Sequence, residues 1–209
     1  MNMKMQLMDD TICAICTPIG PGSVAVIRVS GSSSFKIVKK TFIAKNKKDF
    51  TNFEPRKVYL GDIRFDGTII DEAICIFFTS PSSLTGEDVV EIHTHGGSVV
   101  PNLVIKLLVK LGARIAEPGE FSFRSYQNGK IDLLKAESVA TLIASQTEMA
   151  ANLSTKNISG NIRKKFNEIR DLAISLLSEI EARVDFPEDE VPEIDKKRGF
   201  EEILNSPIY

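Results

Sequence analysis

The sequence predicts an α/β domain followed by a helical segment, and three features of the chain lead to this prediction. Short runs rich in β-branched residues, bounded by glycine or proline, recur through the first 118 residues. An apolar stretch of helical length, VVPNLVIKLLVKL, lies among them and is expected to pack on a sheet. From Leu133 onwards, apolar residues recur at steps of three and four, as on an amphipathic helix. We therefore expect one domain over residues 1–118 and a helical segment over residues 119–209.

The composition is that of an ordinary globular protein, with 43% hydrophobic and 26% charged residues in 209. The 26 basic and 28 acidic residues give a net charge of −2, so the chain has no strongly basic field of the kind that binds nucleic acid. A cluster of lysines is interpreted as a solvated helix face and loop, with phosphate contact the less favoured alternative. These residues are Lys36, Lys39, Lys40, Lys45, Lys47 and Lys48.

The chain contains neither a secretory signal pattern nor a run of about 18 apolar residues, so we expect a soluble cytoplasmic protein without a membrane partner. The odd number of cysteines, three, does not suit a disulfide framework. Cys13 and Cys16 form a single CxxC within a predicted strand, which favours buried or half-buried thiols over metal or redox chemistry. Cys75, between two isoleucines, is expected to pack in the core.

The first two strands are predicted at Cys13–Thr17 and in VAVIRVSG, joined by the PIGPGS loop. Arg28 lies inside the second hydrophobic run, so its guanidinium must reach solvent, an acid or an anionic ligand. A helix over Ser32–Phe42 follows, with serines able to cap it. Strands over Lys57–Phe65 and Ile69–Phe78 then form a hairpin, because Asp-Gly between two such runs is a strong hairpin signal.

The stretch LTGEDVVEIHTHGG, residues 84–97, carries the densest set of polar groups on a predicted strand. Successive strand side chains point to opposite faces, so Glu91, His93 and His95 are expected to share one face. The pair of glycines that follows lets the backbone turn sharply before the helix that begins near Val99. The pattern is typical of a binding site. The alternative is a small core that also carries some polar side chains.

Beyond a short strand over Ala113–Ala116, the chain is predicted to be helical, with a break at Asn128-Gly129 and a new helix capped near Asp132. Lys130 follows this break, and the pattern alone favours an exposed lysine in a helix corner. An apolar stripe from Ile162 to Val184 predicts a long helix that faces a bundle or a partner. Pro187 is expected to end this helix, and the acidic residues 185–195 are interpreted as a solvated linker.

No GxxxxGK[ST] phosphate-binding motif occurs in the chain, so the residues present do not predict nucleotide hydrolysis by that mechanism.

Four motifs, in order and at these separations, resemble the N-terminal part of the tRNA modification GTPase family called MnmE or TrmE. They are PIGPGSVAVIRVSG, SLTGEDVVEIHTHGG, PGEFSFRSYQNGKIDLLKAESVATLI and EIEARVDFPEDEV, and together they extend over about residues 10–195. The resemblance covers nearly the whole chain but only the first part of the family's architecture.

The resemblance implies an α/β (α+β) N-terminal domain that binds folate and resembles aminomethyltransferase folate domains, followed by part of an all-helical domain. It implies a homodimer formed through the N-terminal domain and a 5-formyl-tetrahydrofolate, or related one-carbon folate, as cofactor. With the flavoprotein MnmG, the whole protein would modify carbon 5 of the wobble uridine of tRNA. GTP, Mg²⁺ and K⁺ would belong to a G domain that is absent from this chain, so no catalytic residue is expected in it.

The folate contacts of the family fall on Arg28 of VIRVSG, Glu91 of VEIHTHGG and Lys130 of NGK. This reverses the interpretation of Lys130 as a plain surface lysine. A carboxylate such as Glu91 can accept the adjacent N–H donors of a pterin in paired geometry, and the two cations can meet ligand oxygens. Ser23 stands where a glycine is common in the family.

Two alternatives remain beside this interpretation. One is a metal-dependent hydrolase that uses Glu91, His93 and His95, since two imidazoles on one strand face can hold a metal. The other is a purely structural dimerisation scaffold, which predicts a dimer without affinity for folate. No metal site is expected under the favoured interpretation.

Overall fold

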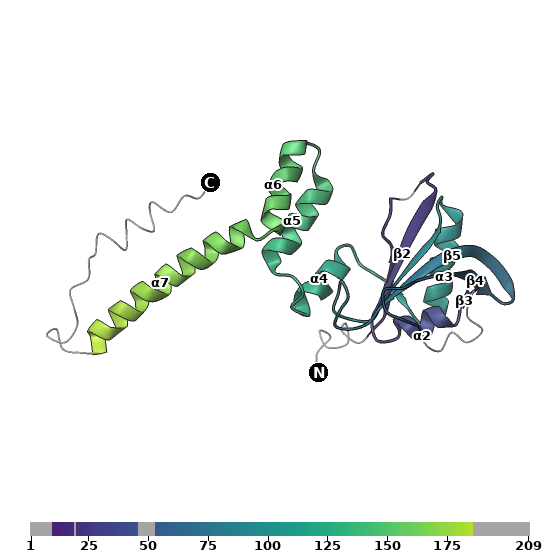
Figure 1. The fold of residues 1–209 in the computed structure, drawn as a ribbon, viewed down its shortest axis with the longest axis horizontal. Helices are drawn as coiled ribbons and strands as arrows, with labels where there is room; N and C mark the ends of the chain where they lie inside the picture. Colours follow the sequence, from purple (N-terminus) through teal and green to yellow (C-terminus); the bar gives the residue numbers. More distant parts are fainter. Residues whose placement is uncertain (1–9, 19, 46–52, 186–209) are drawn as a thin grey trace. The chain divides into compact units, whose positions relative to one another are not determined.

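The computed structural model describes residues 10–18, 20–45 and 53–185, and the chain divides into two compact units. The first unit comprises residues 1–131 and the second residues 132–209. The first is mixed α/β and the second is helical, as the sequence predicts (Figure 1). The expected functional division at residue 118 stays a prediction. The segment predicted as an acidic linker lies, from Phe186 on, outside the described residues.

A seven-stranded sheet in the order β3-β4-β5-β6-β2-β1-β7 forms the centre of the first unit (Figure 1). All its neighbours are antiparallel except β1 and β7. The strands are β1 (Ile12–Ile15), β2 (Val24–Ser30), β3 (Phe42–Ala44), β4 (Val58–Phe65), β5 (Thr68–Phe78), β6 (Val89–His95) and β7 (Arg114–Ile115).

The β4–β5 hairpin turns at Asp66 and Gly67, both with positive φ, 47° and 81°. Such a turn matches the right-handed twist of the flanking strands, and glycine adopts its second position without a Cβ penalty. The predicted hairpin is therefore confirmed. The predicted strand face of β6 is confirmed as well, because Val90, Ile92 and Thr94 are buried while the residues between them are partly or largely exposed.

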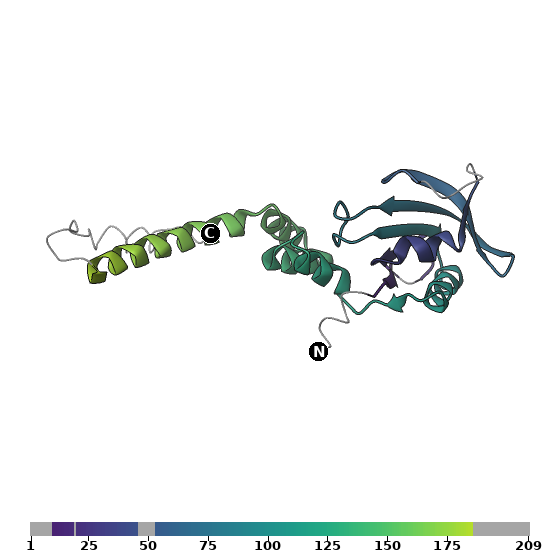
Figure 2. The ribbon, with the colours of Figure 1, turned by 90° about the horizontal axis from the view of Figure 1, so that it is seen from below.

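Two helices, α2 (Ser34–Lys39) and α3 (Val99–Lys110), cover one face of this sheet (Figure 2). Strand residues such as Ile27, Ile92 and Cys75 contribute to a single core with Val38 of α2 and Leu108 of α3, all without measurable exposure. Burial of a large aliphatic side chain is worth about 1.5–3 kcal/mol, so this face supplies most of the unit's stability. The opposite face, which we call the open face, carries the polar residues of β2 and β6.

The sequence-based helix over Ser32–Phe42 is wrong at both of its ends. Helix α2 ends at Lys39, and Phe42 begins strand β3, in which it pairs with Ile63 and is buried. Its serines form no side-chain cap; instead, Ser34 Oγ donates a hydrogen bond to the Asp88 carbonyl. Tertiary pairing with β4 thus overrides the helical pattern of the sequence.

After α4 (Glu120–Gln127), which belongs to the first unit, the described residues of the second unit form three helices. They are α5 (Leu133–Ala144), α6 (Glu148–Ile158) and α7 (Asn161–Asp185). The predicted cap of α5 is confirmed, because Asp132 Oδ1 accepts a hydrogen bond from the Lys135 backbone at 2.8 Å. The apolar stripe of α7 leaves Phe166, for example, 58% exposed.

Candidate functional site

The polar site on the open face is formed by two side chains that face each other across neighbouring strands. Arg28 on β2 and Glu91 on β6 are direct partners in the register of the sheet. The Arg28 guanidinium donates from Nε at 3.0 Å and from Nη2 at 2.8 Å, both to Glu91 Oε1. Both side chains are about one-fifth exposed, 22% and 21%. The arginine therefore meets one of the partners that the sequence required of it, an acid.

One oxygen of this carboxylate stays open. Within the described residues, no hydrogen bond reaches Glu91 Oε2, and His93 Nε2 lies 3.8 Å from this oxygen. On its other side, the Arg28 guanidinium lies 5.4 Å from the centre of the Phe121 ring, a cation–π contact with α4. A half-buried carboxylate with an open oxygen can accept an N–H donor from a ligand.

The two histidines occupy different environments although they share a strand face. His93 Nε2 is buried and has no hydrogen-bond partner. His95 is 73% exposed and its Nδ1 lies 2.7 Å from Asp71 Oδ1, while its backbone N–H donates to Asp71 Oδ2. The structure therefore does not bring Glu91, His93 and His95 together as ligands of one ion. Within the described part of the chain, no group of three or more histidine, cysteine or acidic side chains could hold a metal.

The third predicted site residue, Lys130, contacts the loop that precedes β6. Its Nζ donates to the Pro81 carbonyl at 2.9 Å, and it contacts neither Arg28 nor Glu91 in the described structure. The loop from Pro81 to Gly86 leads into β6, and a Cβ on Gly86 would meet the Lys130 stem at 3.3 Å. Lys130 therefore holds the loop that feeds the strand on which Glu91 lies.

A network of charged side chains around the buried Arg124, which the sequence did not predict, holds this loop. Arg124 of α4 is only 4% exposed and contacts three acids. Its Nη1 donates to Glu87 Oε1 at 3.2 Å, its Nη2 donates to Glu120 Oε1 at 3.0 Å, and it also pairs with the Asp10 carboxylate. Arg114 in turn binds the same Glu120 carboxylate at 2.6 Å. The spacing of Glu120 and Arg124, four residues apart on one helix, was the available signal.

The charges in this network shift one another's pKa. Burial raises the pKa of Glu120, but the hydrogen bonds from Arg114, the Glu117 backbone and Arg124 outweigh it and lower that pKa to about 2. The pKa of Asp10 is lowered in the same way, since the bonds from the two arginines outweigh its burial. These carboxylates therefore stay ionised and tie α4 to the chain before β1 and to the loop before β6.

The cysteines match their interpretation as packing residues in two of three cases. Cys13 and Cys75 are buried in the core, and burial raises the pKa of the Cys13 thiol to about 11. Cys16, beyond the end of β1, is exposed, contrary to the expected half-buried state. The pKa of its thiol is nevertheless raised, because neighbouring protein atoms partly shield the sulfur from water. Because Cys13 faces the core and Cys16 does not, the CxxC pair forms no joint site.

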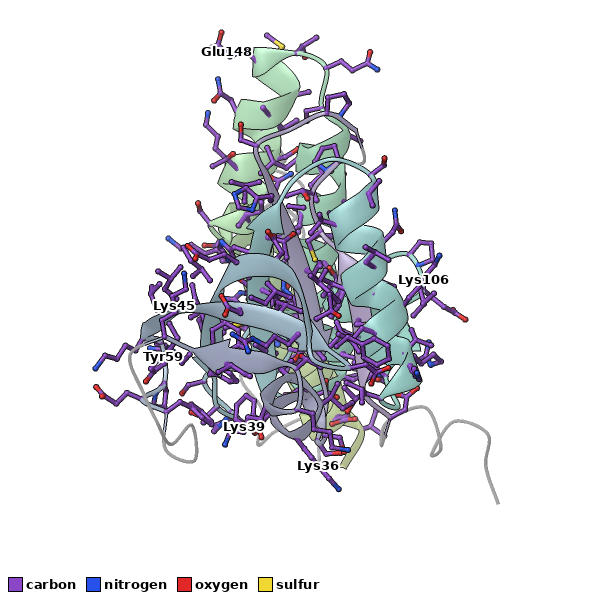
Figure 3. The ribbon with its side chains drawn as sticks, turned by 90° about the vertical axis from the view of Figure 1, so that its right-hand side faces the viewer. Lys36, Lys39, Lys45, Tyr59, Lys106 and Glu148 are labelled. Atoms are coloured by element: carbon purple, nitrogen blue, oxygen red, sulfur yellow. The ribbon has the colours of Figure 1, made fainter. Side chains whose placement is uncertain are left out.

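The lysine cluster of the sequence is spread over helix and loop. Figure 3 shows Lys36 pointing outward from α2, and Lys39 Nζ lies 4.5 Å from the centre of the Phe53 ring. Lys45 pairs with Glu72 of β5. Lys47 and Lys48 lie outside the described residues. Lys39 and Lys45 thus have local partners, and Lys36 and Lys40 are exposed at the surface.

A cavity of about 380 Å³ lies apart from the polar pair, next to the PIGPGS loop. It is lined by residues of that loop and of the start of α3, such as Pro21 and Pro101. Neither Arg28 nor Glu91 lines it. Gly96 is required for the loop's position, because a Cβ there would come within 2.1 Å of the Gly22 carbonyl oxygen.

No helix in the described ranges has the length and apolar character that crossing a membrane requires.

Residues 11–130 match the family model described as the GTP-binding protein TrmE N-terminus, and residues 133–206 match the MnmE helical domain. The chain is 41% identical over 204 residues to the tRNA modification GTPase MnmE of Carboxydothermus hydrogenoformans, covering 95% of this chain and 44% of that protein.

Other relatives show the same coverage. The tRNA modification GTPase MnmE of Fervidobacterium nodosum is 44% identical over 202 residues, with 95% of this chain and 42% of that protein covered. That of Lactococcus lactis subsp. lactis is 38% identical over 204 residues, with 94% and 44% covered. The chain thus spans less than half the length of the curated relatives that it matches. Since two models of one family match successive parts of the chain, the chain belongs to the MnmE (TrmE) family of tRNA modification GTPases.

Proposed function

We propose that this chain forms the folate-binding and dimerising part of a tRNA modification GTPase. Its first unit would bind 5-formyl-tetrahydrofolate or a related one-carbon folate, in a domain that resembles the folate domains of aminomethyltransferases. The proposed division places this function in residues 1–118 and the start of the helical domain in residues 119–209. The relatives are named tRNA modification GTPases, so the whole protein would act on tRNA, with MnmG as partner on the wobble uridine.

The observation that carries the proposal is the half-buried Arg28–Glu91 pair with its open carboxylate oxygen. A pterin presents adjacent N–H donors and a carbonyl oxygen on one edge, so it can replace part of this pair with charge-assisted bonds of its own. The planar guanidinium of Arg28 can then donate hydrogen bonds to a ligand oxygen. Lys130 would contribute a mobile cation near the ligand, besides its bond to the Pro81 carbonyl.

The open face also supports the proposal of a homodimer. On this face, β3, β4 and β5 expose large apolar side chains, whereas the residues between them are buried in the core. A contiguous apolar sheet face in water is typical of a surface that a partner covers. These residues are Ile43 (51% exposed), Val58 (58%), Leu60 (43%) and Ile74 (36%).

The alternatives are less well supported. The metal-dependent hydrolase is not favoured, because His95 pairs with Asp71 and His93 lies beside Glu91 without a third ligand among the described residues. A purely structural scaffold predicts the dimer but no affinity for folate. We propose that this chain has no catalysis of its own and that GTP, Mg²⁺ and K⁺ belong to a G domain beyond it.

The experiment is a calorimetric titration of the chain with 5-formyl-tetrahydrofolate, with GTP as a parallel control and the oligomeric state measured by sedimentation. We expect saturable folate binding and no GTP binding. Glu91→Gln keeps the side chain's shape but removes its charge, so affinity should fall at least about tenfold. Glu72→Gln is the matched control, because its carboxylate lies exposed on the neighbouring strand. Undiminished affinity in Glu91→Gln would overturn the site assignment.

A further inference from the structure

The buried nitrogen of His93 is an unexplained polar atom at the centre of the open face. Its Nε2 has almost no contact with solvent and no hydrogen-bond partner, although the whole side chain is 30% exposed. Leaving a buried N–H unsatisfied costs free energy, so such an atom in a folded protein calls for an explanation. The 3.8 Å to Glu91 Oε2 is too long for a hydrogen bond but short enough to close with a small side-chain movement.

The strand register leaves this nitrogen few other partners. His93 pairs across the sheet with Val26 of β2 on one side and with Ile74 of β5 on the other, and neither side chain offers a hydrogen bond. The charged group that lies beside the ring is the Glu91 carboxylate, 3.8 Å from Nε2. The Glu91 carboxylate is therefore the acceptor that this imidazole can reach.

A ligand that takes Arg28 away from Glu91 would remove the hydrogen bonds that hold that carboxylate in place. In the free chain, both recorded hydrogen bonds to the carboxylate come from Arg28 and converge on Oε1. We propose, on the basis of the function proposed above, that His93 is a positioning residue of the folate site. When the ligand engages the carboxylate, the imidazole donates from Nε2 to Glu91 Oε2 and fixes the orientation in which Glu91 accepts paired N–H donors.

His95 provides the internal contrast. It lies on the same strand face two residues further on, but its ring is already bonded to Asp71 and is 73% exposed. An oriented, solvent-exposed imidazole gains nothing when the carboxylate of Glu91 changes partner. Replacing His93 tests a local effect on Glu91, whereas replacing His95 tests the general effect of losing an imidazole from this strand face.

The test compares the affinity of 5-formyl-tetrahydrofolate for the full chain and three variants. His93→Phe keeps a planar ring between Val26 and Ile74 but removes both nitrogens, and we expect affinity to fall about tenfold. His93→Gln can place an amide N–H near the position of Nε2, so it should restore much of the loss. His95→Gln should bind like the unchanged chain. Circular dichroism of each variant checks that it folds.

A second readout does not depend on any variant's stability. The chain has two histidines, so isotope-labelled imidazole nitrogens give two sets of NMR signals, which the His95→Gln chain assigns. Addition of the folate should shift the Nε2 signal of His93 to that of a hydrogen-bonded donor and leave His95 unchanged. A residue that only fills space would show no such change at its nitrogen.

The outcomes distinguish this inference from the function on which it rests. If the unchanged chain does not bind the folate, the proposed function fails and the role of His93 fails with it. If the unchanged chain binds but His93→Phe binds equally well, or if the His93 Nε2 signal does not move, only the role of His93 is overturned. A loss in His93→Phe that His93→Gln restores supports it.

Discussion

Removal of Arg124 should strongly destabilise the first unit, because its charge is almost fully buried among acids. Its side chain is 4% exposed and pairs with Asp10, Glu87 and Glu120. Substitution Arg124→Met keeps most of the length and apolar stem of the side chain but removes the charge. The variant therefore leaves three carboxylates around an apolar group, and the cost is mainly that of uncompensated charge rather than of lost volume.

The structure sets the size of this effect. Breaking a buried ion pair by removing one partner costs about 3–5 kcal/mol. Each acid here keeps another donor, since Arg114 still binds Asp10 and Glu120, and the Ser30 hydroxyl still donates to Glu87 at 2.6 Å. We therefore expect the lower end of that range, about 3 kcal/mol. An exposed pair, by contrast, is worth about 0–1 kcal/mol.

The assay is equilibrium unfolding at low salt in urea, which does not screen charges. Circular dichroism monitors the unfolding. The free energy of unfolding of Arg124→Met is compared with that of Glu72→Gln, which breaks the exposed pair with Lys45. The double variant with Glu87→Gln should lose clearly less than the sum of the single losses, because both remove the same interaction. A loss below about 1 kcal/mol in Arg124→Met would refute the view that this network holds the unit together.

Two further predictions concern the acid stability of the first unit and the exposure of helix α7. Because the folded pKa of Glu120, about 2, lies below its ordinary value of 4.5, its ionised form stabilises the fold fully above pH 4.5. This contribution is lost as the pH falls from 4.5 towards 2. The free energy of unfolding of Glu120→Gln, measured in urea, should therefore fall less over this pH range than that of the unchanged chain. An equal fall in both chains would contradict the prediction. Amides of α7 should exchange with solvent faster than those of β2 and β6, since Ile180 and Val184 are 55% and 80% exposed; equal protection, measured by hydrogen exchange, would count against this.

Local chemistry made a large part of the fold predictable. The hairpin at Asp66-Gly67 and the cap at Asp132 follow from the backbone preferences of a few adjacent residues. The two faces of β6 follow from the alternation of side chains along any strand. The helix over Ser32–Phe42 failed because pairing of Phe42 with Ile63 is a contact between distant segments, which no local pattern contains.

The site was predictable as a set of residue types but not as a set of contacts. Arg28 in a hydrophobic strand indicated that an acid or an anion must lie near it, yet its pairing with Glu91 depends on the register of strands 63 residues apart. The difference between His93 and His95 was equally hidden, because it comes from Asp71 on a neighbouring strand. The charge network around Arg124 joins segments from Asp10 to Glu120, which are brought together only by the folded sheet.

The position of the polar pair links the two parts of the proposed function. Arg28 and Glu91 lie on the face that carries the exposed apolar side chains of Leu60 and Ile74. A partially exposed ion pair contributes little in water, but charges interact more strongly when a partner excludes solvent from around them. A second copy on this face would therefore strengthen every charged contact that the folate makes with the pair. By thermodynamic linkage, a folate that binds the dimer more tightly must also stabilise the dimer by the same factor.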